Sequence, residues 1–280
     1  MKDTKLIKEF KKICTEGYEQ GWHERNGGNL SYRMNEKEVE ELKEYFNEDG
    51  EWKEIGTEVK DLANEYFMVT GSGKYFKNVN DEFEDTVCIL KVSEDGKKYK
   101  IVYGLVNGGR PTSELPTHLM NLEVLKQRDK DIRIVYHCHP CNTIALTFVL
   151  PLENEVFTRE IWEMMTECPI IFPKGIGVID WMVPGGREIG VKTSEIMKEK
   201  DVAIWAHHGM FVCGKNFDET FGLMYTVEKS AEILVKVLSM SSEKLNTITA
   251  SNFRDLQEPF GITLDEKFLY EKKSKKIGEK

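Results

Sequence analysis

The sequence predicts an α/β fold in which a mixed, largely antiparallel central sheet is layered with helices. Segments with helical periodicity and short strand-like runs follow one another irregularly, which does not fit the regular alternation of a doubly wound parallel sheet. Two of the strand-like runs, 86–92 and 98–105, have the spacing of a hairpin. No repeat or Pro/Gly/Ser-rich linker divides the chain, so a single domain is expected over residues 1–265, followed by a Lys-rich tail over 266–280.

The individual elements follow from the periodicity of apolar residues. Near the N-terminus, Leu6, Phe10 and Ile13 share one face of a predicted helix. The charged segment 34–64 is expected to be a surface insertion that contains a helix. Helices are predicted at 2–20, 114–128, 187–199 and 218–241, with 243–248 as a further candidate. Strands are predicted at 66–70, 86–92, 98–105, 132–139, 170–172 and 202–206.

Composition excludes several classes of protein. Of the 280 residues, 40% are hydrophobic, which is enough for a core and too many for a disordered chain. No run approaches the ~20 apolar residues of a membrane span, and the N-terminus lacks the pattern of a signal peptide, so no membrane partner and a cytoplasmic location are expected. A net charge of −9 disfavours nucleic acid as a partner, although one phosphate group can still bind at a locally built site. The six scattered cysteines are expected to be reduced thiols.

Two histidines lie at the end of a predicted strand. His137 and His139 are separated by one residue, so on a strand both imidazoles point to the same face. Pro140 cannot continue a central ladder and therefore places the pair at the end of the strand. The pair offers two nitrogen ligands to a metal ion. The alternative is a polar strand end whose hydrogen bonds are satisfied within the protein.

A third ligand can come from the segment that follows the predicted strand 202–206. His207 and His208 lie there, and spacing does not decide which of them points inward. Three neutral imidazoles leave zinc an open coordination position, which is typical of a catalytic site. His23 and His118 are expected to be ordinary polar residues.

The C-x-x-C pair formed by Cys138 and Cys141 is not expected to bind metal. If His137 and His139 face the metal, Cys138 points to the opposite side of the sheet. The chain also has no second C-x-x-C that would complete a four-thiolate site.

A carboxylate lies at the start of the predicted helix 114–128. Thr112 or Ser113 is a suitable N-cap, and Pro116 is tolerated in the first turn because its missing N–H has no partner within the helix. Glu114 is then expected in the first turn, where the local sequence favours a stabilising interaction with the helix dipole. A role as a base or as a neighbour of a metal ion is the alternative.

Two loops rich in glycine, hydroxyl and amide groups are candidates for binding an anion. Residues 25–31 read RNGGNLS and residues 70–74 read TGSGK. Glycine lets backbone N–H groups approach a ligand closely, and Asn and Ser add neutral donors. Neither loop matches a P-loop or a dinucleotide-binding motif, and either one alone is more often a simple turn.

Taken together, these segments resemble the class II aldolase family over about residues 6–245. The matching words are GW-x-ERNGGNLS at 21–31, VTGSGKYF at 69–76, PTSELPTH at 111–118, HCHP at 137–140, FTREIWE at 157–163, TEC at 166–168, WMVPG at 181–185, HHG at 207–209 and DETFGL at 218–223. The sequence departs from the family pattern mainly at 34–64, at 107–110 and in the Lys-rich tail. The resemblance implies a three-layer sandwich of the aldolase and adducin type.

The resemblance also implies roles for particular residues. His137, His139 and His208 would bind one Zn²⁺ per subunit, and Glu114 would be the catalytic acid/base. Glu167, in the TEC word, would reach toward the site of a neighbouring subunit in a homotetramer. The substrate phosphate would be surrounded by Asn26, Asn29, Ser72, Gly73, Thr112 and Ser113.

The implied activity is that of a zinc-dependent lyase. It would cleave a phosphorylated ketose, L-rhamnulose 1-phosphate, reversibly to dihydroxyacetone phosphate and L-lactaldehyde, a step in the breakdown of L-rhamnose. Zinc would serve as a Lewis acid, so no Schiff-base lysine is needed. The alternatives are another metal-dependent sugar-phosphate aldolase or 4-epimerase of the same superfamily, and a non-catalytic adducin-like interaction module. The three histidines and the glutamate favour an enzyme.

Overall fold

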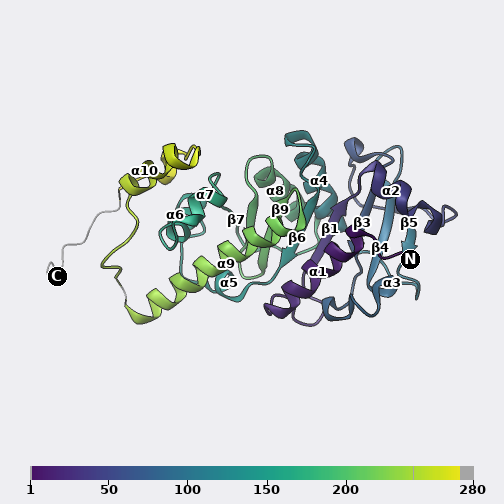
Figure 1. Cartoon of the computed structure of the whole chain (residues 1–280), viewed down its shortest axis with the longest axis horizontal. Helices are drawn as coiled ribbons and strands as arrows, with labels where there is room; N and C mark the ends of the chain where they lie inside the picture. The colour runs from purple at the N-terminus through teal and green to yellow at the C-terminus, as the bar shows by residue number, and fades with distance from the viewer. Residues whose placement is uncertain (1, 242, 272–280) are drawn as a thin grey trace.

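The computed structural model describes residues 2–241 and 243–271, which form one mixed sheet covered by helices (Figure 1). Within this part of the chain, nine strands are hydrogen-bonded in the order β2-β5-β4-β3-β1-β6-β9-β8-β7. Every neighbouring pair is antiparallel except β7 and β8, which are parallel. The predicted fold class and the largely antiparallel sheet are confirmed. The strands are β1 (Asn29–Arg33), β2 (Lys53–Glu54), β3 (Tyr66–Thr70), β4 (Val87–Val92), β5 (Lys98–Gly104), β6 (Ile134–Cys138), β7 (Gly177–Ile179), β8 (Val202–Trp205) and β9 (Gly209–Gly214).

The four long predicted helices are confirmed to within three residues at each end. Side chains that accept hydrogen bonds from unpaired N–H groups mark several of the starts, such as Thr4 before α1 and Asn216 before α9. None of the helices in the described ranges is long and apolar enough to cross a bilayer. The α-helices are α1 (Lys5–Glu19), α2 (Glu36–Leu42), α3 (Phe83–Thr86), α4 (Leu115–Arg128), α5 (Cys141–Leu146), α6 (Asn154–Trp162), α7 (Glu167–Ile171), α8 (Arg187–Met197), α9 (Phe217–Met240) and α10 (Ala250–Phe260).

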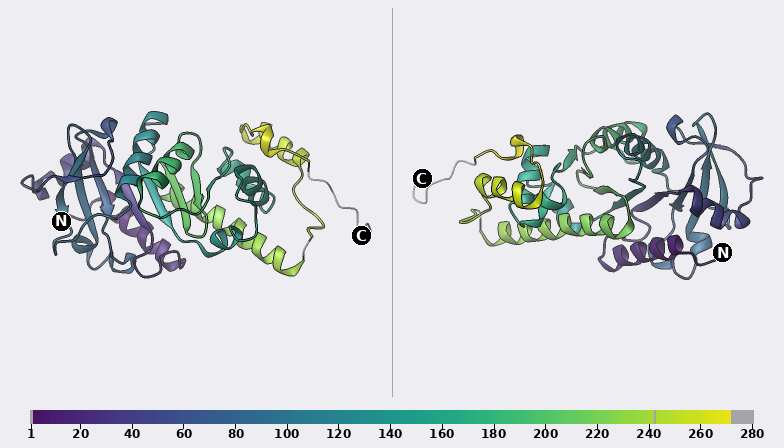
Figure 2. Two further views of the ribbon diagram at one scale, coloured as in Figure 1. Left: turned by 180° about the vertical axis from the view of Figure 1, so that it is seen from behind. Right: turned by 45° about the horizontal axis from the view of Figure 1, so that its top comes forward.

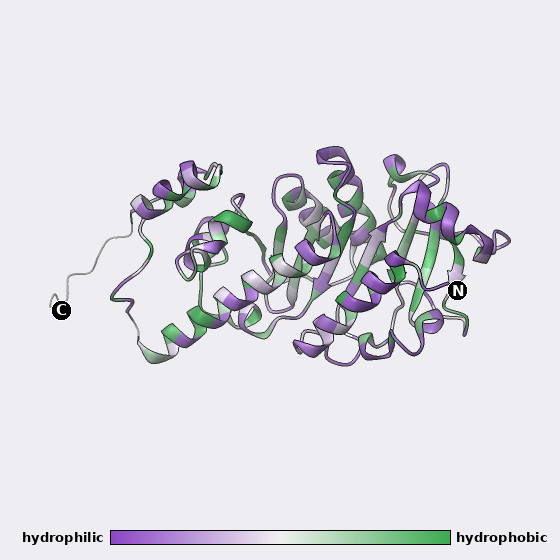
Figure 3. Cartoon of the chain, viewed as in Figure 1, coloured by the Kyte–Doolittle hydropathy of each residue, from purple (hydrophilic) through white to green (hydrophobic). Residues whose placement is uncertain are grey.

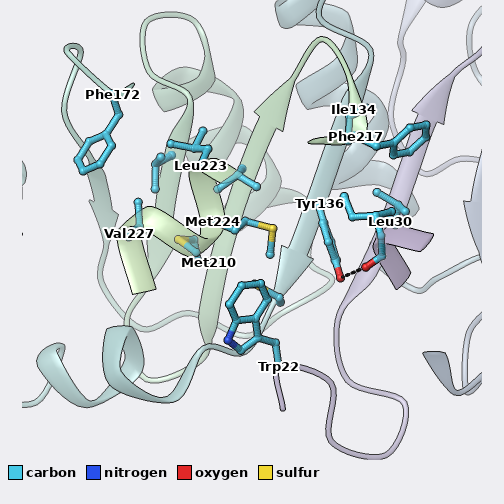
Figure 4. Packing of buried hydrophobic residues seen from close by; sticks show 14 of the residues in the cluster. Trp22, Leu30, Ile134, Tyr136, Phe172, Met210, Phe217, Leu223, Met224 and Val227 are labelled. Carbon is cyan, nitrogen blue, oxygen red and sulfur yellow. Dashed lines mark hydrogen bonds between the residues drawn. The ribbon is translucent and has the colours of Figure 1, made fainter. Parts of the chain in front are cut away.

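Helices pack on both faces of the sheet, so the domain has three layers (Figure 2). On one face, α1 and α9 cover a core in which Met224 of α9 lies beside Tyr136 of β6 and Met210 of β9 (Figure 4). On the other face, α4 and α8 pack against each other over a second core that includes Leu119 and Phe211. Hydrophobic residues concentrate on the strands, and the outer surfaces of α1 and α2 are largely polar (Figure 3).

Some of the predicted elements were wrong or missed. The apolar run 170–172, predicted as a strand, is mostly helical because Glu167–Ile171 form α7, and three apolar residues are too few to distinguish the two periodicities. Residues 243–248 contain no helix. Strands β1, β2, β7 and β9 were missed, as were helices α3, α5, α6 and α10. All five residues of β1 are buried, including polar ones, so the strand shows no alternation of polar and apolar residues.

The segment 34–64 contains the predicted helix and also contributes to the core. Asn35 and Glu38 form a capping box that begins α2. Val59 and Leu62 are completely buried, and β2 extends the sheet beyond β5. At the other end of the chain, Phe268 is also completely buried, so packed residues continue past 265. The rest of the predicted Lys-rich tail, 272–280, lies outside the described residues.

Arg159 of α6 ties the C-terminal residues to the domain. Its side chain is buried, and its Nε donates to Glu163 at 2.7 Å. Its Nη1 donates to the carbonyl oxygens of Phe268 and Tyr270 at 3.0 and 3.1 Å. Glu163 in turn accepts a 2.6 Å hydrogen bond from Lys244. Removing the Arg159 guanidinium leaves the carbonyl oxygens of Phe268 and Tyr270 without this donor and leaves Glu163 with one cation fewer.

Replacing Arg159 by methionine is expected to lower the free energy of unfolding by about 3 kcal/mol, because a buried ion pair is broken. Lys198→Met is the control, since Lys198 and Glu195 form an ion pair whose side chains are 50% and 61% exposed. Loss of an exposed pair changes stability by about 0–1 kcal/mol. Urea unfolding followed by circular dichroism measures both variants, and equal losses would contradict the role of Arg159.

Candidate active site

The ends of β6 and β8 bring three imidazoles together. His137 lies in β6, His139 follows directly after that strand, and His208 lies in the turn between β8 and β9. Because β9 pairs antiparallel with both β6 and β8, these two strand ends meet at the same edge of the sheet. The Nε2 atom of His137 lies 3.2 Å from Nε2 of His139 and 3.3 Å from Nε2 of His208. Of the two adjacent histidines, the structure therefore places His208, not His207, in the cluster.

Hydrogen bonds on the far side of the His137 and His139 rings direct their Nε2 lone pairs toward one point. Nδ1 of His137 donates to the carbonyl oxygen of Met210 at 3.1 Å, and Nδ1 of His139 donates to Oε1 of Glu24 at 2.7 Å. In a neutral imidazole the other nitrogen then carries a lone pair. Lone pairs that face one another repel unless a cation lies between them. Carbonyl and carboxylate partners behind the rings are typical of histidines that bind a metal ion.

Burial favours the uncharged form of His137 and His208. Desolvation, followed by the neighbouring His139 and His208, lowers the pKa of His137 well below its usual value. Burial, followed by the nearby His139, lowers the pKa of His208 to about 4. Neutral imidazole is the form that coordinates a metal, so His137 and His208 are in a form that can bind one near neutral pH.

The dimensions of the cluster fit a divalent cation. A tetrahedral ion at about 2.0–2.1 Å from each nitrogen separates its ligand atoms by about 3.3–3.4 Å, close to the 3.2 and 3.3 Å between the Nε2 atoms. The three histidines are the one group of possible metal ligands found among residues 2–241 and 243–271. Cys138 is buried in the opposite core, and Cys141 is exposed at the start of α5, in agreement with their exclusion as ligands. Three histidines leave one tetrahedral position open.

Glu114 lies beside the cluster at the beginning of α4. Its Oε2 accepts a 2.8 Å hydrogen bond from the amide of Asn29 and lies 3.7 Å from Nε2 of His137. Burial raises the pKa of Glu114 to about 7, and the hydrogen bond from Asn29 partly opposes the rise. A carboxyl group that titrates near neutral pH can both give and take a proton. A cation bound to the histidines would favour the carboxylate and lower this pKa.

The predicted cap of α4 was wrong. The helix begins at Leu115, and Glu114 is the N-cap residue, where a first-turn position had been predicted for it. Neither Thr112 nor Ser113 is the N-cap. The hydroxyl of Thr112 accepts the N–H of Glu114 at 3.3 Å, one residue before the helix begins. The Glu114 side chain does not cap the helix, because it is turned toward Asn29 and the histidines.

Sequence reasoning missed two residues that support the site. Glu24 lies a few residues after the first helix, and its carboxylate lies behind the His139 ring. The two residues are far apart in the sequence, so no local pattern could have predicted their contact. His23, expected to be an ordinary polar residue, is only 2% exposed. Its ring stacks on Phe76 with centroids 3.9 Å apart, and its Nδ1 donates to the carbonyl oxygen of Gly27 at 3.0 Å. His23 thereby holds the glycine-rich loop beside the cluster.

One of the two candidate anion-binding loops, residues 70–74, contacts the segment that precedes α4. Gly71 forms a β-bridge with Pro111, and the N–H of Ser72 donates to the carbonyl oxygen of Arg110 at 2.8 Å. The TGSGK loop therefore lies against the chain that leads into α4. Gly73 has φ +73° and open space where a side chain would lie, so its backbone is accessible.

Of the six predicted phosphate contacts, four are open to solvent and two are not. Thr112 and Asn29 are only 6% and 7% exposed and already have hydrogen-bond partners in the protein. The Asn29 amide nitrogen has a second hydrogen, which Glu114 does not take. The exposed residues are Asn26, Ser72, Gly73 and Ser113.

Glu167 is exposed at the first position of α7, which packs on α6, α9 and α10. Within the described ranges, no hydrogen bond or ion pair joins Glu167 to Glu114 or to the histidine cluster of the same chain. The predicted contribution of Glu167 to the site of a neighbouring subunit stays a prediction.

Comparison with known proteins identifies the family. The model of the class II aldolase and adducin N-terminal domain matches residues 8–235. The chain belongs to this family. A rhamnulose-1-phosphate aldolase of Mannheimia succiniciproducens is 50% identical over 87% of this chain and 90% of its own length. Proteins of the same name from Listeria monocytogenes and Escherichia coli are 45% and 44% identical, over 93% and 90% of this chain and 94% and 92% of their own lengths.

Solved structures of the class II aldolase family have the same fold. A sugar-phosphate aldolase from Thermotoga maritima superposes with a TM-score of 0.73 at 31% identity, covering 86% of this chain and 97% of its own. An L-fuculose 1-phosphate aldolase superposes with a TM-score of 0.59 at 17% identity, covering 94% of this chain and 99% of its own.

Removing the carboxylate behind His139 is expected to weaken metal binding. Glu24→Ala should lower affinity for Zn²⁺ about 10–100-fold, because the ring loses the partner that orients it and sets its tautomer. His139→Ala should lower affinity further. Glu94→Ala, in the exposed turn between β4 and β5, is the matched control. Competition with a zinc-chelating dye measures all three, and unchanged affinity in Glu24→Ala would contradict its supporting role.

Proposed function

We propose that this chain cleaves L-rhamnulose 1-phosphate reversibly to dihydroxyacetone phosphate and L-lactaldehyde, with one Zn²⁺ per subunit. The observation that carries the proposal is the cluster of three imidazoles with Glu114 beside it, in a chain up to 50% identical to proteins named rhamnulose-1-phosphate aldolase. The cluster retains a complete set of ligands and an acid/base, which favours an enzyme over a non-catalytic module. The predicted cytoplasmic location stays a prediction.

Zinc is the expected ion because three neutral imidazoles and an open position form its usual catalytic site. His137, His139 and His208 would hold it, and it would supply a Lewis acid that stabilises the negative charge of the ketone fragment. Side chains around the cluster would transfer the proton and bind the phosphate.

Cleavage breaks the C3–C4 bond and leaves its electron pair on C3. The C4 hydroxyl gives its proton to the Glu114 carboxylate as its oxygen becomes the aldehyde oxygen of L-lactaldehyde. Glu114 gives a proton to C3, which yields dihydroxyacetone phosphate, and takes it back in the reverse reaction. Proton transfer by a positioned carboxyl group typically contributes about 10²–10⁴-fold to the rate.

The phosphate of the substrate binds between residues 70–74 and the segment that leads into α4. Exposed Ser72, Gly73 and Ser113 offer hydroxyl and N–H donors there, and Asn26 offers an amide from the glycine-rich loop. The positive end of the α4 dipole also favours an anion. A site of this kind needs no large basic patch, which suits a chain of net charge −9. In a homotetramer, Glu167 of one subunit would complete the site of another.

Glu114→Gln is expected to keep the fold and bound zinc but to lower kcat at least about 100-fold, because the amide cannot carry the transferred proton. Steady-state kinetics and metal analysis of the purified variant measure the two effects. Near-normal turnover would contradict the acid/base role.

The function itself is tested by incubating the purified protein with L-rhamnulose 1-phosphate and following dihydroxyacetone phosphate by coupled NADH oxidation. Cleavage that is lost with EDTA and restored by zinc is the expected result. Formation of an isomeric sugar phosphate alone would indicate an epimerase. No reaction with zinc-loaded protein would overturn the substrate assignment, and the fuculose and ribulose phosphates would be tried next.

A further inference from the structure

A chain of four buried polar groups runs from β1 to Glu114. Asn29 and Ser31 lie two residues apart on β1, and Glu114 and His118 lie four residues apart at the start of α4. Residues two apart on a strand, or four apart on a helix, share one face, so the two pairs can meet. All four residues are at most 7% exposed. His118 had been expected to be an ordinary polar residue, yet it lies at the centre of this chain.

The carboxylate at one end determines the direction of every hydrogen bond. In its carboxylate form, which a bound cation would favour, Glu114 only accepts, so Asn29 presents its amide N–H to Oε2 at 2.8 Å. The amide oxygen of Asn29 then faces Nε2 of His118, which must carry the hydrogen. Nδ1 of His118 therefore has a lone pair and accepts the hydroxyl of Ser31 at 2.6 Å. Each donor points along the chain toward Glu114.

This arrangement holds His118 in one neutral tautomer. Its hydrogen-bond partners are neutral, and burial lowers the pKa of His118 to about 3. If the hydrogen were on Nδ1 instead, the Nε2 lone pair would face the amide oxygen of Asn29. The Asn29 amide would then have to turn over, and its oxygen would face the Glu114 carboxylate. The orientation of Asn29 therefore depends on the imidazole of His118.

We propose that His118, held by Ser31, is a positioning residue for the acid/base: it orients the Asn29 amide, which in turn holds Oε2 of Glu114 beside the histidine cluster. The inference rests on the proposed role of Glu114. It leaves Oε1 as the oxygen that transfers the proton, because Oε2 is engaged. One amide hydrogen of Asn29 is donated to Glu114, so only the second remains to bind a phosphate.

The tautomer can be measured without substrate. ¹⁵N NMR of zinc-loaded protein labelled at histidine, with the His118 signals assigned by their loss in His118→Phe, is expected to show the Nε2-protonated neutral form at pH 7. A hydrogen on Nδ1 of His118 would overturn the inferred direction of the hydrogen bonds from Ser31 to Glu114. This result stands even if the protein proves to act on another substrate, so failure here is distinguishable from failure of the proposed function.

The effect on catalysis is measured in His118→Phe and, as the milder change, Ser31→Ala. Because the Glu114 carboxyl group is no longer held in place, kcat is expected to fall about 10–100-fold in His118→Phe and by less in Ser31→Ala. KM and zinc content should change less than about twofold in both variants. His118→Gln retains an N–H donor and should recover most of the lost kcat. A change confined to KM or to zinc content, in either variant, would overturn the proposal.

A double-mutant cycle separates positioning from a general structural role. In a Glu114→Gln background, His118→Phe should lower kcat less than about twofold further, because the group it positions is already gone. The same fold loss in both backgrounds would overturn the proposal. Thr117→Val is the matched control, since the Thr117 hydroxyl is buried in the same turn of α4 and has no hydrogen-bond partner among the described residues. Its kcat should stay within about twofold of the unchanged protein.

Discussion

The pairing of β1 with β6 at the middle of the sheet is the constraint on which the site depends. In this register Asn29 lies opposite His137, and Ser31 lies opposite Val135. A slip of one residue would turn Asn29 and Ser31 to the other face, toward α1 and α9. The same strand β6 pairs with β9 on its other edge and thereby brings the turn that carries His208 to the cluster. Metal ligands, acid/base and supporting amide thus share one hydrogen-bonded framework.

Burial has opposite consequences for the two kinds of titratable group at this framework. It lowers the pKa of His137 and so keeps the imidazole neutral, and it raises the pKa of Glu114 toward neutral pH. Both changes remove charge from the site. A bound cation adds charge back and would favour the carboxylate. The side chains of the cluster are therefore arranged for a positive ion, and carbonyl and carboxylate partners behind the rings of His137 and His139 set their geometry.

The fold was predictable to the extent that each element shows its own periodicity. The amphipathic helices α1 and α9 were recognised because one face is apolar and the other polar. The strand β1 was not, because both of its faces are buried and its polar residues look like a loop. The run that forms the end of α7 was too short to show a period, and helix packing decided its conformation.

For the site, the sequence by itself determined the set of chemical groups: a His-x-His pair at a strand end, an adjacent pair of histidines, and a glutamate before a helix. The family resemblance assigned their roles. Only the tertiary structure decided which neighbours support them, because Glu24, Ser31 and His118 meet their partners through packing between elements far apart in the chain. Side-chain hydrogen bonds depend on distances of a few tenths of an ångström, and local spacing carries no information about such distances across a sheet.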